Sequence, residues 1–425
     1  MFQRLYLLYL LIFNVEEVQR CRLNSRNHFG EPLPVIIKDG KLLEPTDRYG
    51  NVDLTRGENL TLSCEGSGHL YHPSMNHEEI TATITCDTGE YFTNNAWLNG
   101  SAGFTSFRCS YPPPHVSERT NRTCFQDNRI YEVGYRIQNE WYPIYESCFD
   151  ENRLNAIYSK YTQKPYNANY QTRVERPYFI DDNNIYRSVG VESLFSPKGQ
   201  KNGVANLVGS RVNSYFVGDQ LLSRGHLAAK TDFVYAFGER ATFHYVNCAP
   251  QWTGFNGGNW NTLEVDLRNH VNYANYYTII YTGTYGVSSL MNDQYQRVHL
   301  YLTEDYNNNQ VVPVPEYFYK VVYEPSTQKG IAFIGINNPY YSVNEAVDMF
   351  FCPDLCRGGL DLSWLSWHPN NPSEGFTFCC SVPDFRQTVR HLPHFEVTGL
   401  LTYYFFDKSL IYFLICYRFL CVPHS

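Results

Sequence analysis

Two polar residues within one short segment have the chemistry needed for a hydrolytic reaction. His226 ends the sequence Leu222-Ser-Arg-Gly-His226, and a neutral imidazole accepts a proton from water near neutral pH. Arg224 lies two residues earlier, and its planar guanidinium matches two phosphate oxygens at once, which a lysine does not. The pair therefore predicts a general base beside a phosphate-binding group. Free imidazole titrates near about 6.5, so activity is expected to rise with pH toward an alkaline optimum.

A second segment supplies oxygen ligands for a metal ion. Asn256 and Glu264 bound the sequence Asn256-Gly-Gly-Asn-Trp-Asn-Thr-Leu-Glu264, which contains no Cys or His pair at the spacing of a zinc site. Oxygen ligands and retained waters suit a hard cation such as Mg²⁺. We therefore expect a magnesium ion that faces the leaving group of a phosphate ester.

A strand and a helix are needed to position these residues. The sequence Ala241-Thr-Phe-His-Tyr-Val-Asn247 alternates as a strand does. Apolar residues at helical spacing follow the Gly257-Gly258 pair, namely Trp260, Leu263, Leu267 and Val271. A strand is therefore expected to lead into a helix that begins at Asn256. On that helix Glu264 and Arg268 are four residues apart and share a face.

With these motifs the chain resembles the DNA/RNA non-specific endonucleases of the ββα-metal, or His-Me finger, type. The family's Arg-Gly-His matches Arg224 to His226, its Asn-x-Ala-Pro-Gln matches Asn247 to Gln251, and its Asn-x-x-x-Trp-x-x-x-Glu matches Asn256 to Glu264. Many members have Asp before the arginine, where this chain has Ser223. The resemblance continues to about Leu401 and is greatest to secreted arthropod members such as insect double-stranded ribonucleases or alkaline nucleases.

The resemblance implies a cofactor, substrates and residue roles. The implied cofactor is Mg²⁺, or Mn²⁺ in its place, and the implied substrates are single- or double-stranded DNA and RNA, cut to 5′-phosphate products. The residue roles are His226 as the base, Asn256 as the direct metal ligand, Arg224 and Arg268 as phosphate contacts, and Asn247 and Glu264 as holders of metal-shell water.

Each of these residues also has a purely structural interpretation. A single histidine beside an apolar residue such as Leu227 is usually part of the core, and an Arg-Gly pair is usually a turn. The ordered occurrence of several polar positions at the family's spacing favours the nuclease. His244 and His270 lack such a motif, so we expect them to be structural.

The composition is that of a globular protein with two or three domains. The chain has 425 residues, of which 43% are hydrophobic and 18% are charged. Its net charge of −8 is unusual for a nucleic-acid binder, because phosphate contacts need a basic surface. A positive groove is therefore expected from the local excess of basic residues, which are Arg187, Lys198, Lys201, Arg211, Arg224, Lys230 and Arg240.

The start of the chain and its cysteines indicate secretion. Met1 to Arg4 and the apolar run Leu5 to Phe13 are typical of a signal peptide, which we expect over residues 1–20. Thirteen cysteines are many for a cytosolic enzyme. Sequons for N-glycosylation occur at Asn59, Asn99 and Asn121. An extracellular, disulfide-bonded glycoprotein is predicted, in the gut lumen, saliva or haemolymph.

Residues 21–114 are expected to form a small β-rich domain. Short alternating runs such as Leu60–Cys64 and Ile80–Cys86 are separated by Gly, Asn and Asp. Disulfides whose pairing stays open are expected among Cys21, Cys64, Cys86, Cys109 and Cys124. The domain is either an accessory substrate-binding or targeting module or a structural lid, and the lid is favoured. Pro112 to Pro114 marks its boundary as a semi-rigid linker.

Residues 115–401 are expected to form the catalytic domain, an α+β fold around a central antiparallel sheet. The predicted strands are Tyr131–Tyr135, Trp141–Cys148, Val298–Leu302, Tyr317–Tyr323 and Gly330–Ile336, with Leu154–Tyr161 as a strand or short helix. Disulfides rather than zinc are favoured for Cys352, Cys356, Cys379 and Cys380, which lack His partners. In the tail, residues 402–425, the apolar run from Ser409 to Val422 is interrupted by Arg418, and the uninterrupted stretch is too short to span a bilayer, so no stable membrane association is expected.

The predicted function is that of a secreted, Mg²⁺-dependent endonuclease that hydrolyses phosphodiester bonds of DNA and RNA, including double-stranded RNA. One alternative is a catalytically silent, secreted nucleic-acid-binding protein, which would bind without cleaving. Another is a glycan- or matrix-binding protein for which the nuclease fold is a scaffold. Activity of the fragment 115–401 alone would argue against the second alternative.

Overall fold

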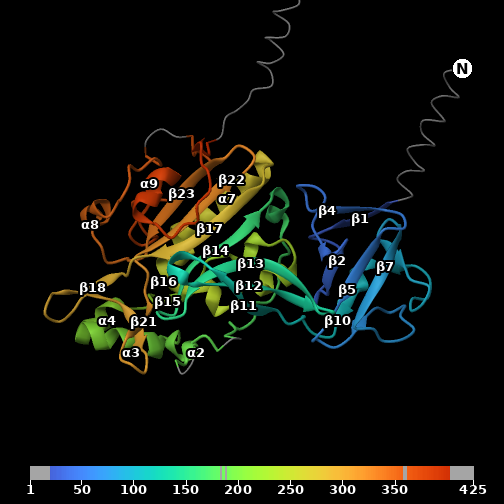
Figure 1. Ribbon diagram of the computed structural model, residues 1–425, viewed down its shortest axis with the longest axis horizontal. Helices are drawn as coiled ribbons and strands as arrows, with labels where there is room; N and C mark the ends of the chain where they lie inside the picture. Colours follow the sequence, from blue (N-terminus) through green and yellow to red (C-terminus); the bar gives the residue numbers. More distant parts are fainter. Residues whose placement is uncertain (1–19, 182–183, 187–188, 358–360, 403–425) are drawn as a thin grey trace, which may run out of the picture.

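The computed structural model describes residues 20–181, 184–186, 189–357 and 361–402. Figure 1 shows an N-terminal β unit, in blue, at one end of the molecule, and beyond it a larger sheet with helices around it. Residues 1–19 of the predicted signal peptide and all but the first residue of the predicted apolar tail lie outside the described residues, whereas Arg20, the last residue of the predicted signal peptide, begins a strand. No described helix is long and apolar enough to cross a membrane.

The N-terminal unit is built on a six-stranded sheet of order β3-β2-β5-β7-β8-β9. Its strands are β2 (Val35–Lys38), β3 (Lys41–Leu42), β5 (Asn59–Ser63), β7 (Thr81–Thr88), β8 (Tyr91–Thr93) and β9 (Ala102–Gly103). Two short antiparallel pairs accompany it, β1 (Arg20–Asn24) with β4 (Asn51–Thr55) and β6 (Leu70–Tyr71) with β10 (Arg108–Cys109). The strands predicted at Leu60–Cys64 and Ile80–Cys86 are confirmed as β5 and β7.

The larger unit is a nine-stranded, mostly antiparallel sheet of order β11-β12-β13-β14-β17-β22-β23-β24, with β25 parallel to β23. Its strands are β11 (Val116–Thr123), β12 (Arg129–Ile137), β13 (Glu140–Asp150), β14 (Asn155–Gln163), β17 (Thr278–Tyr285), β22 (Tyr317–Glu324), β23 (Lys329–Ile336), β24 (Thr377–Cys380) and β25 (Gly399–Leu400). The predicted central sheet is therefore present, and Leu154–Tyr161 is strand rather than helix.

One predicted strand of this sheet was wrong. The run Val298–Leu302 divides between β19 (Arg297–His299) and β20 (Tyr301–Glu304), which lie outside the central sheet. These strands form short hairpins with β18 (Ser289–Met291) and β21 (Gln310–Pro313). The run is interrupted because the backbone N–H of Leu300 donates to Ser288 instead of joining either pair.

Side chains of the central sheet alternate between two cores, as successive residues of a strand must. On β22, Phe318 and Val322 face a core shared with helix α7 (Asn261–Ala274) and with the N-terminal unit, whereas Tyr319 and Val321 face a second core. The other α-helices among the described residues are α2 (Val191–Leu194), α3 (Pro197–Val208), α4 (Val212–Tyr215), α5 (Ala236–Ala241), α6 (Thr253–Phe255), α8 (Val343–Asp348) and α9 (Val382–Thr388). The sheet is thus covered on both faces.

Five disulfides link described cysteines: Cys21–Cys86, Cys64–Cys109, Cys124–Cys148, Cys352–Cys380 and Cys356–Cys379. The prediction of disulfides rather than zinc in the C-terminal region is confirmed. The sequence suggested that Cys124 bonds within the N-terminal group, and this was wrong. Cys124 bonds to Cys148 instead, because it lies beside β12 and β13 of the larger sheet.

The N-terminal unit shares a hydrophobic core with the larger unit. Phe29 packs on Tyr235, with ring centroids 4.8 Å apart, and on Phe104 of its own unit at 5.0 Å. The carbonyl of Phe29 accepts a hydrogen bond from Gln171 Nε2 at 2.8 Å. Buried apolar side chains of both units belong to one continuous hydrophobic core. The division into an accessory domain and a catalytic domain stays a prediction.

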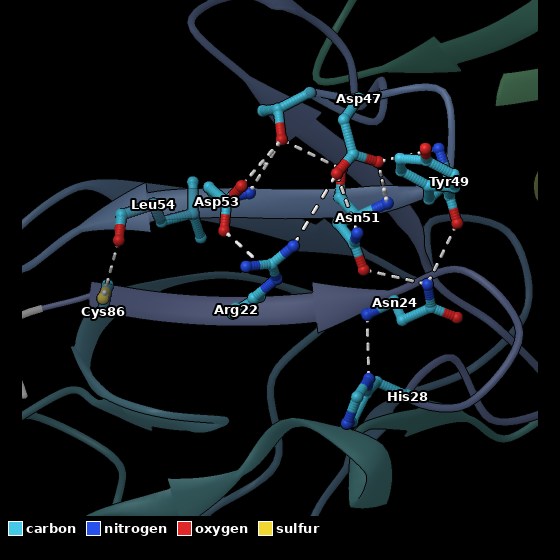
Figure 2. A network of polar contacts seen from close by, with 10 residues as sticks. Arg22, Asn24, His28, Asp47, Tyr49, Asn51, Asp53, Leu54 and Cys86 are labelled. Carbon is cyan, nitrogen blue, oxygen red and sulfur yellow. Dashed lines mark hydrogen bonds and ion pairs between the residues drawn. The ribbon is translucent and has the colours of Figure 1, made fainter. Parts of the chain in front are cut away.

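A turn of the N-terminal unit also reaches helix α7. Asp47 accepts hydrogen bonds from the backbone and side-chain nitrogens of Asn51 and forms an ion pair with Arg22 (Figure 2). Nη2 of Arg22 lies 3.7 Å from Oδ2 of Asp47. These contacts fix the intervening Arg48, whose carbonyl oxygen accepts a hydrogen bond from Asn272 Nδ2 of α7 at 2.7 Å. The N-terminal unit therefore supports the helix that carries Glu264 and Arg268 of the predicted site.

Replacement of Phe29 by alanine is expected to lower the free energy of unfolding by about 3–5 kcal/mol, because it leaves a cavity between Tyr235 and Phe104. Urea unfolding followed by tryptophan fluorescence measures this change. Tyr111→Ala is the matched control in the same unit, because Tyr111 is 71% exposed. Equal stability of the two variants would contradict a shared core.

Candidate active site

The predicted site is built on two strands followed by a helix. Strand β15 (Leu222–His226) pairs antiparallel with β16 (Cys248–Trp252), which places His226 opposite Cys248. The chain then passes through α6 and a π-helical turn, Asn256–Trp260, into α7. The order strand, strand, helix agrees with the ββα fold implied by the sequence motifs.

The predicted strand Ala241–Asn247 was wrong. The strand of the site begins directly after this segment, at Cys248, and is β16. Helix α5 ends at Ala241, and Tyr245–Asn247 forms a 3₁₀ turn. Every residue from 241 to 252 is buried, so the alternation of residue types in 241–247 did not reflect a two-faced strand. Asn247 Nδ2 donates to the carbonyl of Thr242, and this local bond stabilises the turn instead.

The ring of His226 is half-buried between two phenylalanines. Its centroid lies 5.0 Å from that of Phe179 and 4.8 Å from that of Phe243. Nε2 of His226 is buried and has no hydrogen-bond partner among the described residues. Burial, and then the positive charges of Arg176 and Lys230, lower the pKa of His226 to about 3. The imidazole is therefore neutral at physiological pH, with an unprotonated ring nitrogen, and it is a weaker base than free imidazole.

The lowered pKa changes the pH dependence expected from a free imidazole. Because the neutral form persists until the pH falls to about 3, we expect the NMR signals of His226 to stay constant between pH 5 and 8. In the urea-unfolded chain the same signals should titrate near about 6.5. A titration near 6.5 in the folded protein would contradict the burial of His226, and would restore the alkaline rise expected from the sequence.

Arg224 is held among aromatic rings beside His226. Its Nε donates to the hydroxyl of Tyr245 at 3.1 Å, and Nη2 donates to the carbonyl of Glu192 at 3.3 Å. The guanidinium carbon lies 5.3 Å from the ring centroid of Phe195 and 5.7 Å from that of Tyr245. Many family members have Asp where this chain has Ser223, and here the aromatic rings orient the arginine. The predicted phosphate contact remains open to test.

Asn247 joins the end of β15 to the central sheet. Its Oδ1 accepts hydrogen bonds from the backbone N–H of Ala228 at 2.8 Å and from the hydroxyl of Ser159 at 2.7 Å. Its Nδ2 donates to the carbonyls of Ala228 and Thr242. The carboxamide is fully used in holding the scaffold behind His226. Its predicted role as a holder of metal-shell water stays a prediction.

Asn256 begins the π-helical turn before α7. It is half-buried, and within the described residues its carboxamide makes no hydrogen bond to the protein. A π-helical turn inside a helix is often found at functional sites. An amide oxygen without a protein partner suits a hard cation such as Mg²⁺. This arrangement is compatible with the predicted metal ligand.

Two charged side chains of α7 point into the core behind this turn. Arg268 is 4% exposed, donates from Nε to the carbonyl of Thr231 at 2.9 Å, and lies 3.5 Å from the carboxylate of Asp232. Burial raises the pKa of Glu264 to about 7, against the lowering effect of Lys320. The guanidinium of Arg268 is thus bound by the protein itself, and a phosphate contact by Arg268 stays a prediction.

The structure adds residues that the sequence did not single out. Lys320 of β22 is fully buried and donates to the hydroxyls of Tyr161 and Thr282 at 2.9 and 2.8 Å. Asp232 accepts hydrogen bonds from Tyr161 at 2.6 Å and from Gln163 at 3.0 Å. Neither Lys320 nor Asp232 stands in a motif, so only the fold reveals that they surround Glu264 and Arg268.

The expected positive groove is only partly available. Lys230 lies 2.7 Å from the carboxylate of Glu239, and the buried Arg240 lies 2.9 Å from Glu31. These two basic residues therefore neutralise acids of the scaffold. Arg187 falls outside the described residues.

Two histidines outside the motifs are packed against other rings in the interior, and their structural role stays a prediction. His244 is fully buried, and its Nε2 lies 2.7 Å from Nδ1 of His115. The ring of His270 stacks on Trp364, with centroids 4.4 Å apart.

Three comparisons relate the chain to known proteins. The sequence profile of the DNA/RNA non-specific endonuclease family matches residues 126–385. The salivary endonuclease of Lutzomyia longipalpis is 28% identical over 361 residues, which cover 83% of this chain and 79% of that protein. Salivary protein Tsal2A of Glossina morsitans morsitans is 26% identical over 406 residues, 91% of this chain and 95% of that protein. A solved structure of the EndoG/EndoGI complex has 17% identity and a TM-score of 0.35, and covers 60% of this chain and 87% of that chain.

Proposed function

The chain belongs to the DNA/RNA non-specific endonuclease family, and from this premise we propose that it is a secreted, Mg²⁺-dependent endonuclease acting on both DNA and RNA. Double-stranded RNA is included among its substrates. The observation that carries the proposal is the neutral imidazole of His226, whose buried Nε2 has no partner among the described residues. His226 lies on the same strand as Arg224, whose guanidinium is suited to binding phosphate.

The residues around Asn256 fit a hard divalent cation. The carboxamide of Asn256 has no partner among the described residues, and Glu264 lies two helical turns further along the same helical segment. Oxygen donors favour Mg²⁺ or Mn²⁺ over zinc. When bound, the ion supplies positive charge that stabilises the departing oxygen.

His226 supplies the proton transfer of the proposed reaction. Its imidazole takes a proton from water while the water oxygen forms a bond to phosphorus, and the bond from phosphorus to the 3′-oxygen breaks. The departing 3′-oxygen takes up a proton from solvent water and becomes a hydroxyl, which leaves a 5′-phosphate on the other product, and the imidazole of His226 then releases its proton to solvent. Arg224 stabilises the extra negative charge of the transition state.

Base specificity is expected to be weak, because every proposed contact meets the phosphodiester and contacts to the backbone position a nucleic acid without reading its sequence. The test compares duplex DNA, duplex RNA and a 2′-O-methyl RNA duplex at matched salt, with Mg²⁺ or with chelator. Cleavage of all three with Mg²⁺, giving 5′-phosphates, is the expected result. Resistance of DNA and the methylated duplex, with 2′,3′-cyclic phosphates from RNA, would overturn the water mechanism.

Secretion is supported by the disulfides and by the salivary names of the relatives. We expect glycosylation at the three sequons, since Asn59, Asn99 and Asn121 are all exposed. Mass spectrometry of the secreted protein before and after glycosidase treatment tests this. Unmodified asparagine at all three positions would contradict it.

A catalytically silent nucleic-acid-binding protein is the second candidate. It is favoured by the side chains of Arg268 and Asn247, which are bonded to the protein rather than directed to a substrate. The same assay separates the two candidates. Salt-sensitive binding without cleavage in either Mg²⁺ or Mn²⁺ would establish the silent protein.

A further inference from the structure

The π-helical turn that carries Asn256 is held by a loop that comes much later in the chain. Asn259 of the turn bonds to His368 of this loop, 109 positions further on. We call residues 366–375 the clasp loop. Asn259 is fully buried, and its Oδ1 accepts a hydrogen bond from the backbone N–H of His368 at 2.7 Å. Its Nδ2 donates to the carbonyls of His368 at 2.8 Å and Gly375 at 2.6 Å. One side chain thus binds both ends of the clasp loop.

The backbones of the turn and the clasp loop are in direct contact. The N–H of Asn259 donates to the carbonyl of Glu374 at 3.0 Å. A Cβ atom at Gly258 would lie 2.7 Å from Cα of Glu374, and one at Gly254 would lie 2.5 Å from the carbonyl oxygen of Ser373. Such distances leave no room for a side chain, so glycine permits the close approach at both positions.

The clasp loop is itself anchored on both sides. At its start, the backbone N–H and hydroxyl of Ser366 donate to the carboxylate of Asp266 on α7 at 2.6 and 2.8 Å. At its end, the chain continues directly into β24 of the central sheet, where Cys379 is disulfide-bonded to Cys356. The loop therefore connects the turn to the rigid central sheet.

We infer that Asn259 is a positioning residue for the metal site, because its three side-chain hydrogen bonds to the clasp loop fix the turn that presents Asn256. The inference rests on the proposed role of Asn256 as metal ligand. Loss of a group that orients a metal ligand typically lowers metal affinity by about 10–100-fold. We expect a loss of that size when Asn259 is replaced. Asn259 itself holds no metal in this arrangement, since all its polar side-chain atoms are bonded to the loop.

The test measures metal binding without substrate. Mn²⁺ affinity is determined by electron paramagnetic resonance for the full-length protein and for Asn259→Ala, and the rise in melting temperature on adding Mg²⁺ is recorded for both. We expect Asn259→Ala to bind Mn²⁺ about 10–100-fold more weakly and to lose most of the Mg²⁺-induced rise. Its affinity for nucleic acid in chelator should stay unchanged.

Ser366→Ala is the matched control, because it removes only the hydroxyl contact of the same loop, keeps the backbone hydrogen bond from residue 366 to Asp266, and leaves the turn untouched. Its Mn²⁺ affinity is expected to equal that of the unmodified protein. If Asn259→Ala does not fold, the double substitution Cys356→Ser and Cys379→Ser decides, because it loosens the loop and alters no residue of the turn. That variant is expected to bind Mn²⁺ more weakly as well.

The outcomes separate this inference from the function on which it rests. If the unmodified protein binds no Mn²⁺ and gains no thermal stability from Mg²⁺, the proposed metal role is wrong. If the unmodified protein binds Mn²⁺ and folded Asn259→Ala binds it equally well, the metal role stands and the positioning role of Asn259 is overturned. A loss of affinity in Ser366→Ala as large as in Asn259→Ala would also overturn it.

Discussion

His226→Ala is expected to lower kcat by about 10²–10⁴-fold, the usual loss for a missing general base, while nucleic-acid binding stays nearly intact. The proton acceptor disappears, whereas the proposed phosphate contact of Arg224 is held by Tyr245, Phe195 and Glu192 and does not depend on the imidazole. Single-turnover cleavage measures the chemical step, and fluorescence anisotropy in chelator measures binding.

His391→Ala is the matched control for this substitution. His391 also has a pKa lowered by burial, to about 4, but it contacts Tyr319 in the second core, on the other face of the sheet. Its loss is expected to reduce stability and to leave the rate of the folded fraction unchanged. A variant at His226 that kept most of its rate would show that another group is the base.

Asn256→Ala is expected to reduce activity by more than the roughly 10–100-fold typical of groups outside the metal's own shell, because it removes the only proposed direct protein ligand. Excess Mg²⁺ should restore only part of the rate. Glu264→Ala, which alters a group proposed to act through water, should be rescued further by the same excess. Rates measured across a Mg²⁺ titration distinguish these responses.

Asn261→Ala provides the control, because Asn261 is an exposed asparagine at the start of the same helix. It should leave the Mg²⁺ titration unchanged. Equal insensitivity of the Asn256 and Glu264 variants to Mg²⁺ concentration would contradict the coordination proposed for this site.

The sequence predicted the helix that carries part of the candidate site. Leu263, Leu267 and Val271 form the buried stripe of α7, as their helical spacing indicated, whereas no strand was predicted at Leu222–His226, which is β15. Periodicity is a reliable guide to α7 because this helix buries one face. The same reasoning failed for 241–247, where both faces are buried and periodicity carries no information.

The electrostatics of the site could not be read from spacing. The pKa of His226 depends on burial beside Phe179, 47 residues earlier in the chain, and that of Glu264 depends on Lys320, 56 residues later. The clasp loop likewise meets Asn259 only through tertiary packing. These contacts follow from the assembled sheet, and no local motif records them.

The contact between Arg48 and Asn272 has a consequence for the synthesis of the protein. These residues are 224 positions apart, and Glu31 and Arg240 are separated by 209. The N-terminal unit therefore leaves the ribosome long before its packing partners are synthesised. During that interval the ring of Phe29 cannot pack against Tyr235. Because such distant contacts form slowly and exposed apolar surface aggregates, nascent chains that end before α7 should depend on chaperones.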